Sequence, residues 1–237
     1  MKENELGFNR LAVLGLGEIG SSIASAARMH GLAREVVAYD EDDATGELAL
    51  RLGAIDHFEK EPARVVLGAQ VVVFSVSLSR LFVLCRETGK HLRPDTLLVE
   101  TSGATRRLRK QLTGAHQVFE KLVSSFPLVH FRNRGPVAAD PASWDGSRIV
   151  IAGNGQQGGE HLPQAQKLFS DLGAEPIVVG ADSFEKLVCW HSFLPRVVLE
   201  AFSGLLPEGE RVEGMSVAGA MLELGSGQLP DDERDRQ

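Results

Sequence analysis

Two patterns of apolar and polar residues alternate regularly along the first 180 residues of this chain. Short runs that are almost entirely apolar alternate with longer segments in which apolar residues recur every three to four positions. The apolar runs predict strands near 10–15, 35–39, 54–58, 71–75, 96–100, 121–125, 148–152 and 176–179. The segments with helical spacing predict helices over 18–30, 43–53, 78–90, 105–113 and 160–172. Strands without a polar face are typical of parallel sheets covered on both sides, so we expect an α/β, Rossmann-type doubly wound, mainly parallel sheet.

The pattern changes after Asp182, where the apolar residues keep helical spacing and no further strand is predicted. Residues 183–204 predict a helix that Pro195 should kink, and residues 212–225 predict a second one. These helices are too few to enclose a core of their own. We therefore expect a dinucleotide-binding domain over 1–181 and a short helical dimerisation or substrate segment over 182–237, ending in a disordered tail. Exposed apolar positions in this segment favour a homodimer.

A glycine-rich loop joins the first predicted strand to the first predicted helix. Gly15, Gly17 and Gly20 form Gly-x-Gly-x-x-Gly, with Glu18 and Ile19 inside the motif. The first glycine allows a tight turn, the second lets a pyrophosphate approach bare backbone, and the third lets helix and strand pack closely. The N-terminus of the helix would attract the phosphates through its unpaired N–H groups. The motif therefore predicts a dinucleotide site.

Asp40 ends the second predicted strand, 20 residues beyond Gly20, the usual separation for a carboxylate that accepts hydrogen bonds from the adenosine ribose. Because a carboxylate there repels a 2′-phosphate, NAD is expected and NADP is less favoured. Residues 41–43 are also acidic, so Asp40 has an alternative interpretation as a capping residue of a turn. The ends of later strands add four candidates for the nicotinamide half of the cofactor: Ser75, Val76, Ser77 and Thr101.

Composition limits the class of protein. A formal net charge of −7 argues against a nucleic-acid-binding surface. No apolar run reaches the roughly 18 residues that a membrane span needs, and residues 1–10 lack the apolar centre of a signal peptide. Cys85 and Cys189 are the two cysteines, which implies no disulfide framework, and no Cys/His spacing predicts a metal site. We expect a cytoplasmic protein that acts on a small molecule.

Several segments match one family in order. They are residues 15–20, 31–40 and 52–56, then Phe126-Pro127-Leu128, Gly135-Pro136, Trp144-Asp145-Gly146 and Ser192-Phe193-Leu194-Pro195-Arg196. Together they resemble the prephenate/arogenate dehydrogenase family, the oxidoreductases of tyrosine biosynthesis, over roughly residues 10–204. The resemblance implies a Rossmann fold and hydride transfer between NAD and a carboxylate-bearing substrate, with a cyclohexadienyl ring among the candidates.

Departures from the family pattern fall on the residues that carry its chemistry. The family's catalytic histidine, which accepts the proton of the ring hydroxyl, corresponds to Phe126 here. Its serine in Gly-Ser-Val-Lys falls on Gly103, and the two histidines of Ser-His-Leu-Pro-His correspond to Phe193 and Arg196. The C-terminal helical part has roughly half the family's length. These departures imply an altered substrate or mechanism.

Other residues are candidates for the missing roles. His130, four residues beyond Phe126, and His191 could act as general acid or base, because the pKa of histidine suits neutral pH. Each has the alternative of a surface or core histidine. Ser102 offers a hydroxyl beside Gly103 as a third catalytic candidate. Three residues are candidates for contacting the substrate, the arginines through its carboxylate: Phe126, Arg132 and Arg196.

The sequence leaves three functions open. The first is the NAD-dependent oxidoreductase, on a new substrate or on prephenate itself; losing a general base costs about 10²–10⁴-fold in rate and leaves room for slow turnover. The alternative is a catalytically impaired nucleotide-binding pseudoenzyme or partner protein. A reductase of imines or keto acids follows by analogy of fold alone.

Overall fold

The structure is a computed structural model, and it describes residues 7–104, 118–129, 135–153 and 161–203. The chain forms two compact units, Met1–Glu185 and Lys186–Gln237. Among the described residues, no helix is both long and apolar enough to cross a membrane.

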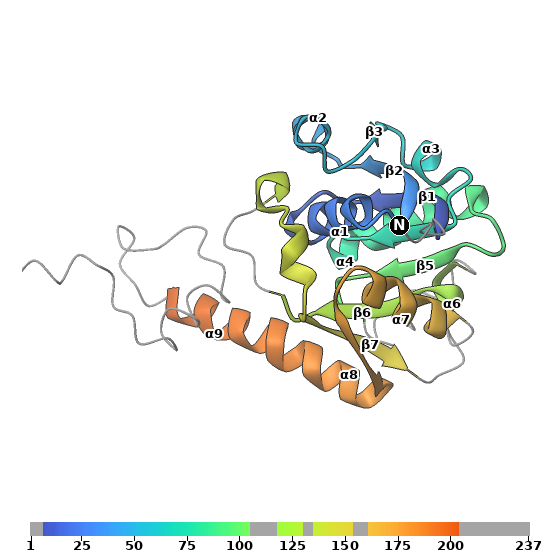
Figure 1. The fold of residues 1–237 in the computed structure, drawn as a ribbon. Coiled ribbons are helices and arrows are strands. Elements are labelled where there is room, and N and C mark those ends of the chain that lie inside the picture. The colour runs from blue at the N-terminus through green and yellow to red at the C-terminus, as the bar shows by residue number, and fades with distance from the viewer. Residues whose placement is uncertain (1–6, 105–117, 130–134, 154–160, 204–237) are drawn as a thin grey trace, which may run out of the picture. The chain divides into compact units, whose positions relative to one another are not determined.

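Within the described residues, the first unit is built on an eight-stranded sheet (Figure 1). Its strands are β1 (Phe8–Leu14), β2 (Ala33–Tyr39), β3 (His57–Phe58), β4 (Val71–Phe74), β5 (Leu97–Glu100), β6 (Val123–Pro127), β7 (Arg148–Gly153) and β8 (Glu175–Gly180). Their order is β3-β2-β1-β4-β5-β6-β7-β8, and all neighbours are parallel except β6 and β7. The chain runs from β1 outward to β2 and β3, then returns to β4 on the other side of β1. This reversal beside β1 is where doubly wound sheets bind their ligands.

The helices of the first unit agree with the predicted ones to within a few residues at each end. They are α1 (Glu18–Met29), α2 (Asp43–Arg51), α4 (Leu78–Thr88) and α7 (Leu162–Asp171). Shorter elements were not predicted because they span too few residues for a periodic pattern: α3 (Pro62–Val66), α6 (Val118–Lys121) and the 3₁₀ turns η1 (Gly89–His91), η2 (Gly135–Ala138) and η3 (Pro141–Trp144). The helix predicted over 105–113 lies outside the described residues.

Both faces of the central strands are buried, which explains their apolar runs. Alternate residues of β1 point to opposite faces: Leu11 and Val13 pack in a core with α1 and α7, whereas Ala12 and Leu14 pack in a second core with α3 and α4. All four side chains are fully buried. The mainly parallel, doubly wound sheet expected from the sequence is therefore confirmed.

In the second unit, the described residues form a π-helical turn, η5 (Cys189–Phe193), followed by α9 (Leu194–Ser203). The preceding helix α8 (Ala181–Val188) contains the boundary between the units. Instead of the kink expected at Pro195, the structure shows this π turn directly before it, in which the N–H of Leu194 donates to the carbonyl of Cys189, five residues back. The helix predicted over 212–225 and the tail lie outside the described residues.

Candidate cofactor site

The glycine loop packs backbone against backbone. Gly15 follows β1 with a φ of +98°, and its N–H donates to the carbonyl of Tyr39 at 2.8 Å. A Cβ on Gly15 would lie 2.3 Å from the carbonyl oxygen of Ser75, and one on Gly20 would lie 2.0 Å from that of Gly15. Both approaches are closer than any side chain allows. The two glycines therefore let the ends of β1 and β4 and the start of α1 meet.

Gly17 has a different environment from the other two glycines. It is the N-cap of α1, with extended backbone, and no side chain caps the helix there. A Cβ on Gly17 would meet nothing within 4 Å. The first N–H groups of α1 thus lie beside open space, and these unpaired donors can bind an anion such as a pyrophosphate. Glu18 and Ile19, in the first turn, are both partly exposed.

Asp40 joins the glycine loop to the end of β2. Its Oδ2 accepts a hydrogen bond from the N–H of Leu16 at 2.7 Å, and its Oδ1 accepts one from the N–H of Asp42 at 3.0 Å. The side chain is therefore a turn cap, as the alternative interpretation held. A carboxylate has about four acceptor positions, so it can still accept bonds from a ribose hydroxyl. The two interpretations of Asp40 are compatible.

One cavity, of about 210 Å³, gathers most of these groups. It is lined by Gly15, Gly17, Tyr39, Asp40, Glu41, Ser75, Val76, Ser77 and Arg80. Six of these residues were cofactor candidates from the sequence. The four other candidates, Glu18, Ile19, Gly20 and Thr101, are not among its lining residues. The open N-cap of α1 and the free space beside Gly17 fit the phosphates of a dinucleotide.

Arg80 belongs to the site and was missed by sequence reasoning. It lies in the first turn of α4, three residues after the N-cap Ser77. Its guanidinium donates to the Tyr39 hydroxyl at 2.8 Å, lies 6.0 Å from the centre of that ring, and pairs with the carboxylate of Glu41. Partial burial by itself lowers the pKa of Arg80. The hydrogen bond to Tyr39 and the nearby charges, Glu41 among them, raise that pKa by more than burial lowers it, so the net shift is upward and the group stays charged.

A buried carboxylate shapes the next strand end. Glu100 is fully buried; its Oε2 accepts from the N–H and the hydroxyl of Ser102 at 2.7 and 2.6 Å, and its Oε1 accepts from the N–H of Ala104 at 2.8 Å. Thr101, also buried, donates to the Ser75 hydroxyl at 3.2 Å and so joins the two strand ends. The Ser102 hydroxyl, a catalytic candidate, is thus already engaged as a donor.

The candidates for substrate chemistry are spread over several parts of the chain. Phe126 lies in β6, partly exposed, opposite Val150 of β7. His130 and Arg132 lie outside the described residues. His191 is exposed in η5, and Arg196 belongs to α9, both in the second unit. Of the predicted substrate and acid–base residues, Phe126 and Ser102 are those that the described part of the first unit contains.

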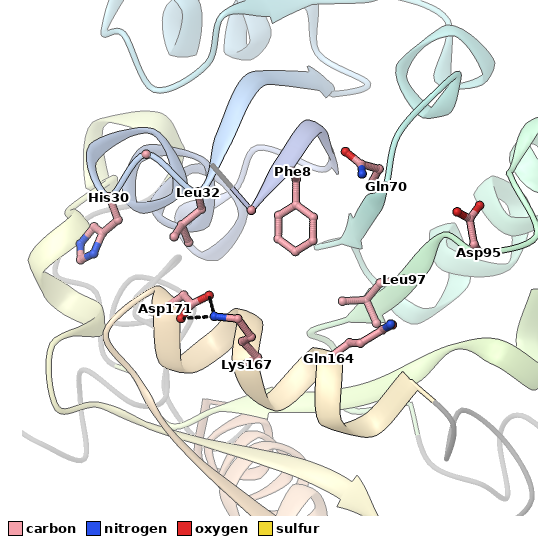
Figure 2. Close-up of a pocket in the computed structure, with 11 residues that line it drawn as sticks. Phe8, His30, Leu32, Gln70, Asp95, Leu97, Gln164, Lys167 and Asp171 are labelled. Atoms are coloured by element: carbon pink, nitrogen blue, oxygen red, sulfur yellow. Dashed lines mark hydrogen bonds and ion pairs between the residues drawn. The ribbon is translucent and has the colours of Figure 1, made fainter. Parts of the chain in front are cut away.

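A larger cavity, of about 710 Å³, opens at the opposite end of the strands, where β1 and β5 begin (Figure 2). Phe8 and Leu97, at the first residues of β1 and β5, line it together with Lys167 and Asp171 of α7, which pair at 2.7 Å. Ligands of doubly wound sheets bind at the carboxyl ends of the strands, which is where the cavity beside Asp40 lies and this larger cavity does not. Nowhere in the described residues do three or more His, Cys, Asp or Glu side chains gather to hold a metal ion.

A family model described as the nucleotide-binding domain of prephenate dehydrogenase matches residues 23–178, well over half of the chain. The chain belongs to the prephenate dehydrogenase family. The match begins within α1, so the glycine loop at residues 15–20 lies before the matched residues. The loop is therefore identified by its own geometry. Oxidoreductase chemistry is the family's activity, and the matched domain is its nucleotide-binding part.

Individual relatives are distant. A cyclohexadienyl dehydrogenase of Zymomonas mobilis is 21% identical over 86% of this chain and 69% of its own length. A prephenate dehydrogenase of Lactococcus lactis is 24% identical over 81% of this chain, which spans about half, 52%, of that protein. The prephenate dehydrogenase structure of Aquifex aeolicus, in complex with hydroxyphenyl propionate and NAD+, superposes with a TM-score of 0.76 at 18% identity, covering 86% of this chain and 71% of that one. This structural likeness shows the fold.

Proposed function

We propose that this chain is an NAD-dependent oxidoreductase that transfers hydride between the nicotinamide and a carboxylate-bearing substrate. Prephenate and arogenate, both cyclohexadienyl acids, are the first candidates, because the relatives are named as cyclohexadienyl and prephenate dehydrogenases. The observation that carries the proposal is the single cavity that joins the open N-terminus of α1 to Asp40. NAD+ in the Aquifex relative supports the choice of cofactor.

Several groups in and beside the cavity have a part in holding the cofactor. The N–H groups at the start of α1 bind the pyrophosphate, and Asp40 accepts hydrogen bonds from the adenosine ribose. Ser75, Val76 and Ser77, at the end of β4, line the side toward the nicotinamide half, and Thr101 holds that strand end in place. When bound, the nicotinamide supplies the hydride acceptor. NADP is disfavoured because the carboxylate of Asp40 repels a 2′-phosphate.

The proton acceptor is the least conventional part of the proposal. Phe126 cannot accept a proton, so it serves as an apolar wall for the substrate, and His130 or His191 acts as the general base. Ser102 needs to exchange its bond to Glu100 for one to the substrate. Arg132 and Arg196 are proposed to hold the substrate carboxylate, for which a guanidinium fork is suited.

The C-terminal segment, 182–237, is proposed to complete the substrate site and to form a homodimer. Large apolar side chains are exposed along its described part: Trp190, Phe193, Leu194, Val197 and Val198. Sedimentation of the full chain tests this, because a monomer at micromolar concentration would contradict it. A cytoplasmic location belongs to the same proposal and is tested by fractionating cells.

Activity is tested by incubating the full chain with NAD and either prephenate or arogenate. We expect NADH to accumulate together with the aromatic product, detected by absorbance and by chromatography. The rate should be slow, because an enzyme without its usual general base loses about 10²–10⁴-fold. Restoring the histidine in Phe126→His should raise the rate, and Phe126→Leu is the matched control that adds no base. NADH binding without turnover in any of these proteins would contradict the oxidoreductase.

Phe126, which stands at the position of the family's catalytic histidine, favours a second function. A chain that binds nucleotide but has lost its proton acceptor can act as a pseudoenzyme that associates with a partner protein. It predicts tight NADH binding, no turnover with either acid, and no gain in Phe126→His. The same three proteins therefore decide between the two functions.

A further inference from the structure

Four consecutive acidic residues follow β2, and each has a different partner. Asp40 accepts from the N–H of Leu16, and Asp42 caps α2 by accepting from Ala44 N–H and the Thr45 hydroxyl. Asp43 pairs with Lys60, and Glu41 pairs with Arg80. Only the Glu41 pair crosses the cofactor cavity, since Glu41 and Arg80 both line it, on the β2 and α4 sides respectively.

Arg80 is held more firmly than Glu41. Its side chain is 25% exposed and is anchored by the buried Tyr39, through the hydrogen bond of 2.8 Å and the contact with the ring. The Glu41 side chain is 63% exposed. Among the described residues that line this cavity, Arg80 carries the one positive charge.

The position of this pair matters for the choice between NAD and NADP. A 2′-phosphate needs a cationic partner, and a guanidinium forms two parallel hydrogen bonds to phosphate oxygens. Arg80 is such a group and lies in the same cavity as Asp40, the proposed ribose ligand. The carboxylate of Glu41 forms an ion pair with this guanidinium and adds a second negative charge beside Asp40. An ion pair this exposed is weak, so a phosphate could replace Glu41 if its charge were absent.

We propose that Glu41 and Arg80 together determine the cofactor selectivity of this site. Glu41 neutralises Arg80 and so keeps the cavity without a free cation for a 2′-phosphate. Asp40 alone does not determine the selectivity. The site also contains Arg80, an arginine able to bind a phosphate, which is paired with Glu41 instead. This inference rests on the proposed function in one respect, that the cavity binds the adenosine half of a dinucleotide.

The test is calorimetric titration of the full chain with NADH and with NADPH, so that no turnover is required. In Glu41→Gln, the ratio of the NADPH dissociation constant to that of NADH should fall about tenfold, because the guanidinium becomes available to the phosphate. Adding Arg80→Met, which keeps an apolar stem over Tyr39 and removes the charge, should abolish that gain. Glu47→Gln removes the same charge from α2, outside the cavity, and should leave the ratio unchanged.

The outcomes separate the two proposals. If NADH binds the wild-type chain and Glu41→Gln leaves the ratio unchanged, the selectivity pair is wrong and the cofactor site stands. If the double variant keeps the gain, Glu41 acts through repulsion alone and the role of Arg80 is wrong. If the wild-type chain binds neither nucleotide, both proposals fail. Thermal melting of each variant shows that it is folded.

Discussion

Replacing Gly20 by alanine tests the account of the glycine loop most severely. The new Cβ would lie 2.0 Å from the Gly15 carbonyl oxygen and 3.1 Å from the Ser75 Cβ. The oxygen belongs to a turn with a φ of +98°, which cannot rotate away, so α1 must move by about 1 Å to restore an ordinary contact. Overpacking costs about 1–3 kcal/mol, and a clash this close with a backbone atom belongs in the upper part of that range, about 2–3 kcal/mol, whereas the better helix propensity of alanine returns about 1 kcal/mol.

The free energy of unfolding of Gly20→Ala should therefore fall by about 1–2 kcal/mol, which corresponds to roughly 2–8 °C in melting temperature for a chain of this size. Because the N-terminus of α1 moves with the helix, the affinity for NADH should fall at least about tenfold as well. Chemical denaturation and calorimetric titration measure the two effects on the same preparation.

Gly17→Ser is the matched control, because a Cβ at this position meets nothing within 4 Å and serine is a good N-cap. Its stability should equal or exceed that of the wild type. Its NADH affinity should still fall about tenfold, since the hydroxyl occupies the space and the N–H groups offered to the pyrophosphate. Wild-type stability in Gly20→Ala, or wild-type NADH affinity in Gly17→Ser, would refute this reasoning.

Two further predictions concern other residues. Glu100→Gln should lower the free energy of unfolding by about 1–3 kcal/mol, measured in urea, because one amide oxygen cannot accept every bond that Ser102 and Ala104 donate; an unchanged midpoint would contradict it. Bonds from Thr45 and from the helix backbone lower the pKa of Asp42, so its stabilisation is present at neutral pH and is lost as the pH falls through the acid range. The melting temperatures of the wild type and Asp42→Ala should therefore converge on acidification, and a constant difference would show that the charge is irrelevant.

The sequence predicted those features of the fold that depend on local spacing. Buried parallel strands appear as apolar runs, and the glycine loop with Asp40 has a fixed separation along the chain. The antiparallel pairing of β6 with β7 was not predicted, because a short apolar run has the same appearance in either direction. The effect of Pro195 was foreseen as a kink, but the π turn depends on backbone hydrogen bonds that no residue type specifies.

The candidate site was only partly visible for a similar reason. Arg80 becomes a cavity residue because α4 begins opposite the end of β2, a relation between segments about forty residues apart. In the sequence, Glu100 is simply a polar residue at the end of a strand. Its burial depends on the following turn, whose N–H groups donate hydrogen bonds to its carboxylate. One signal was available: Arg80 is three residues beyond Ser77, and therefore in the first turn of the helix that follows this candidate.

The most direct test of the account is a titration of the full wild-type chain with NADH and, separately, with NADPH, followed by the heat released. The account predicts a micromolar dissociation constant for NADH and at least about tenfold weaker binding of NADPH, because Asp40 and Glu41 both oppose a 2′-phosphate. Tighter binding of NADPH would contradict the assigned selectivity, and binding of neither nucleotide would contradict the cofactor site itself.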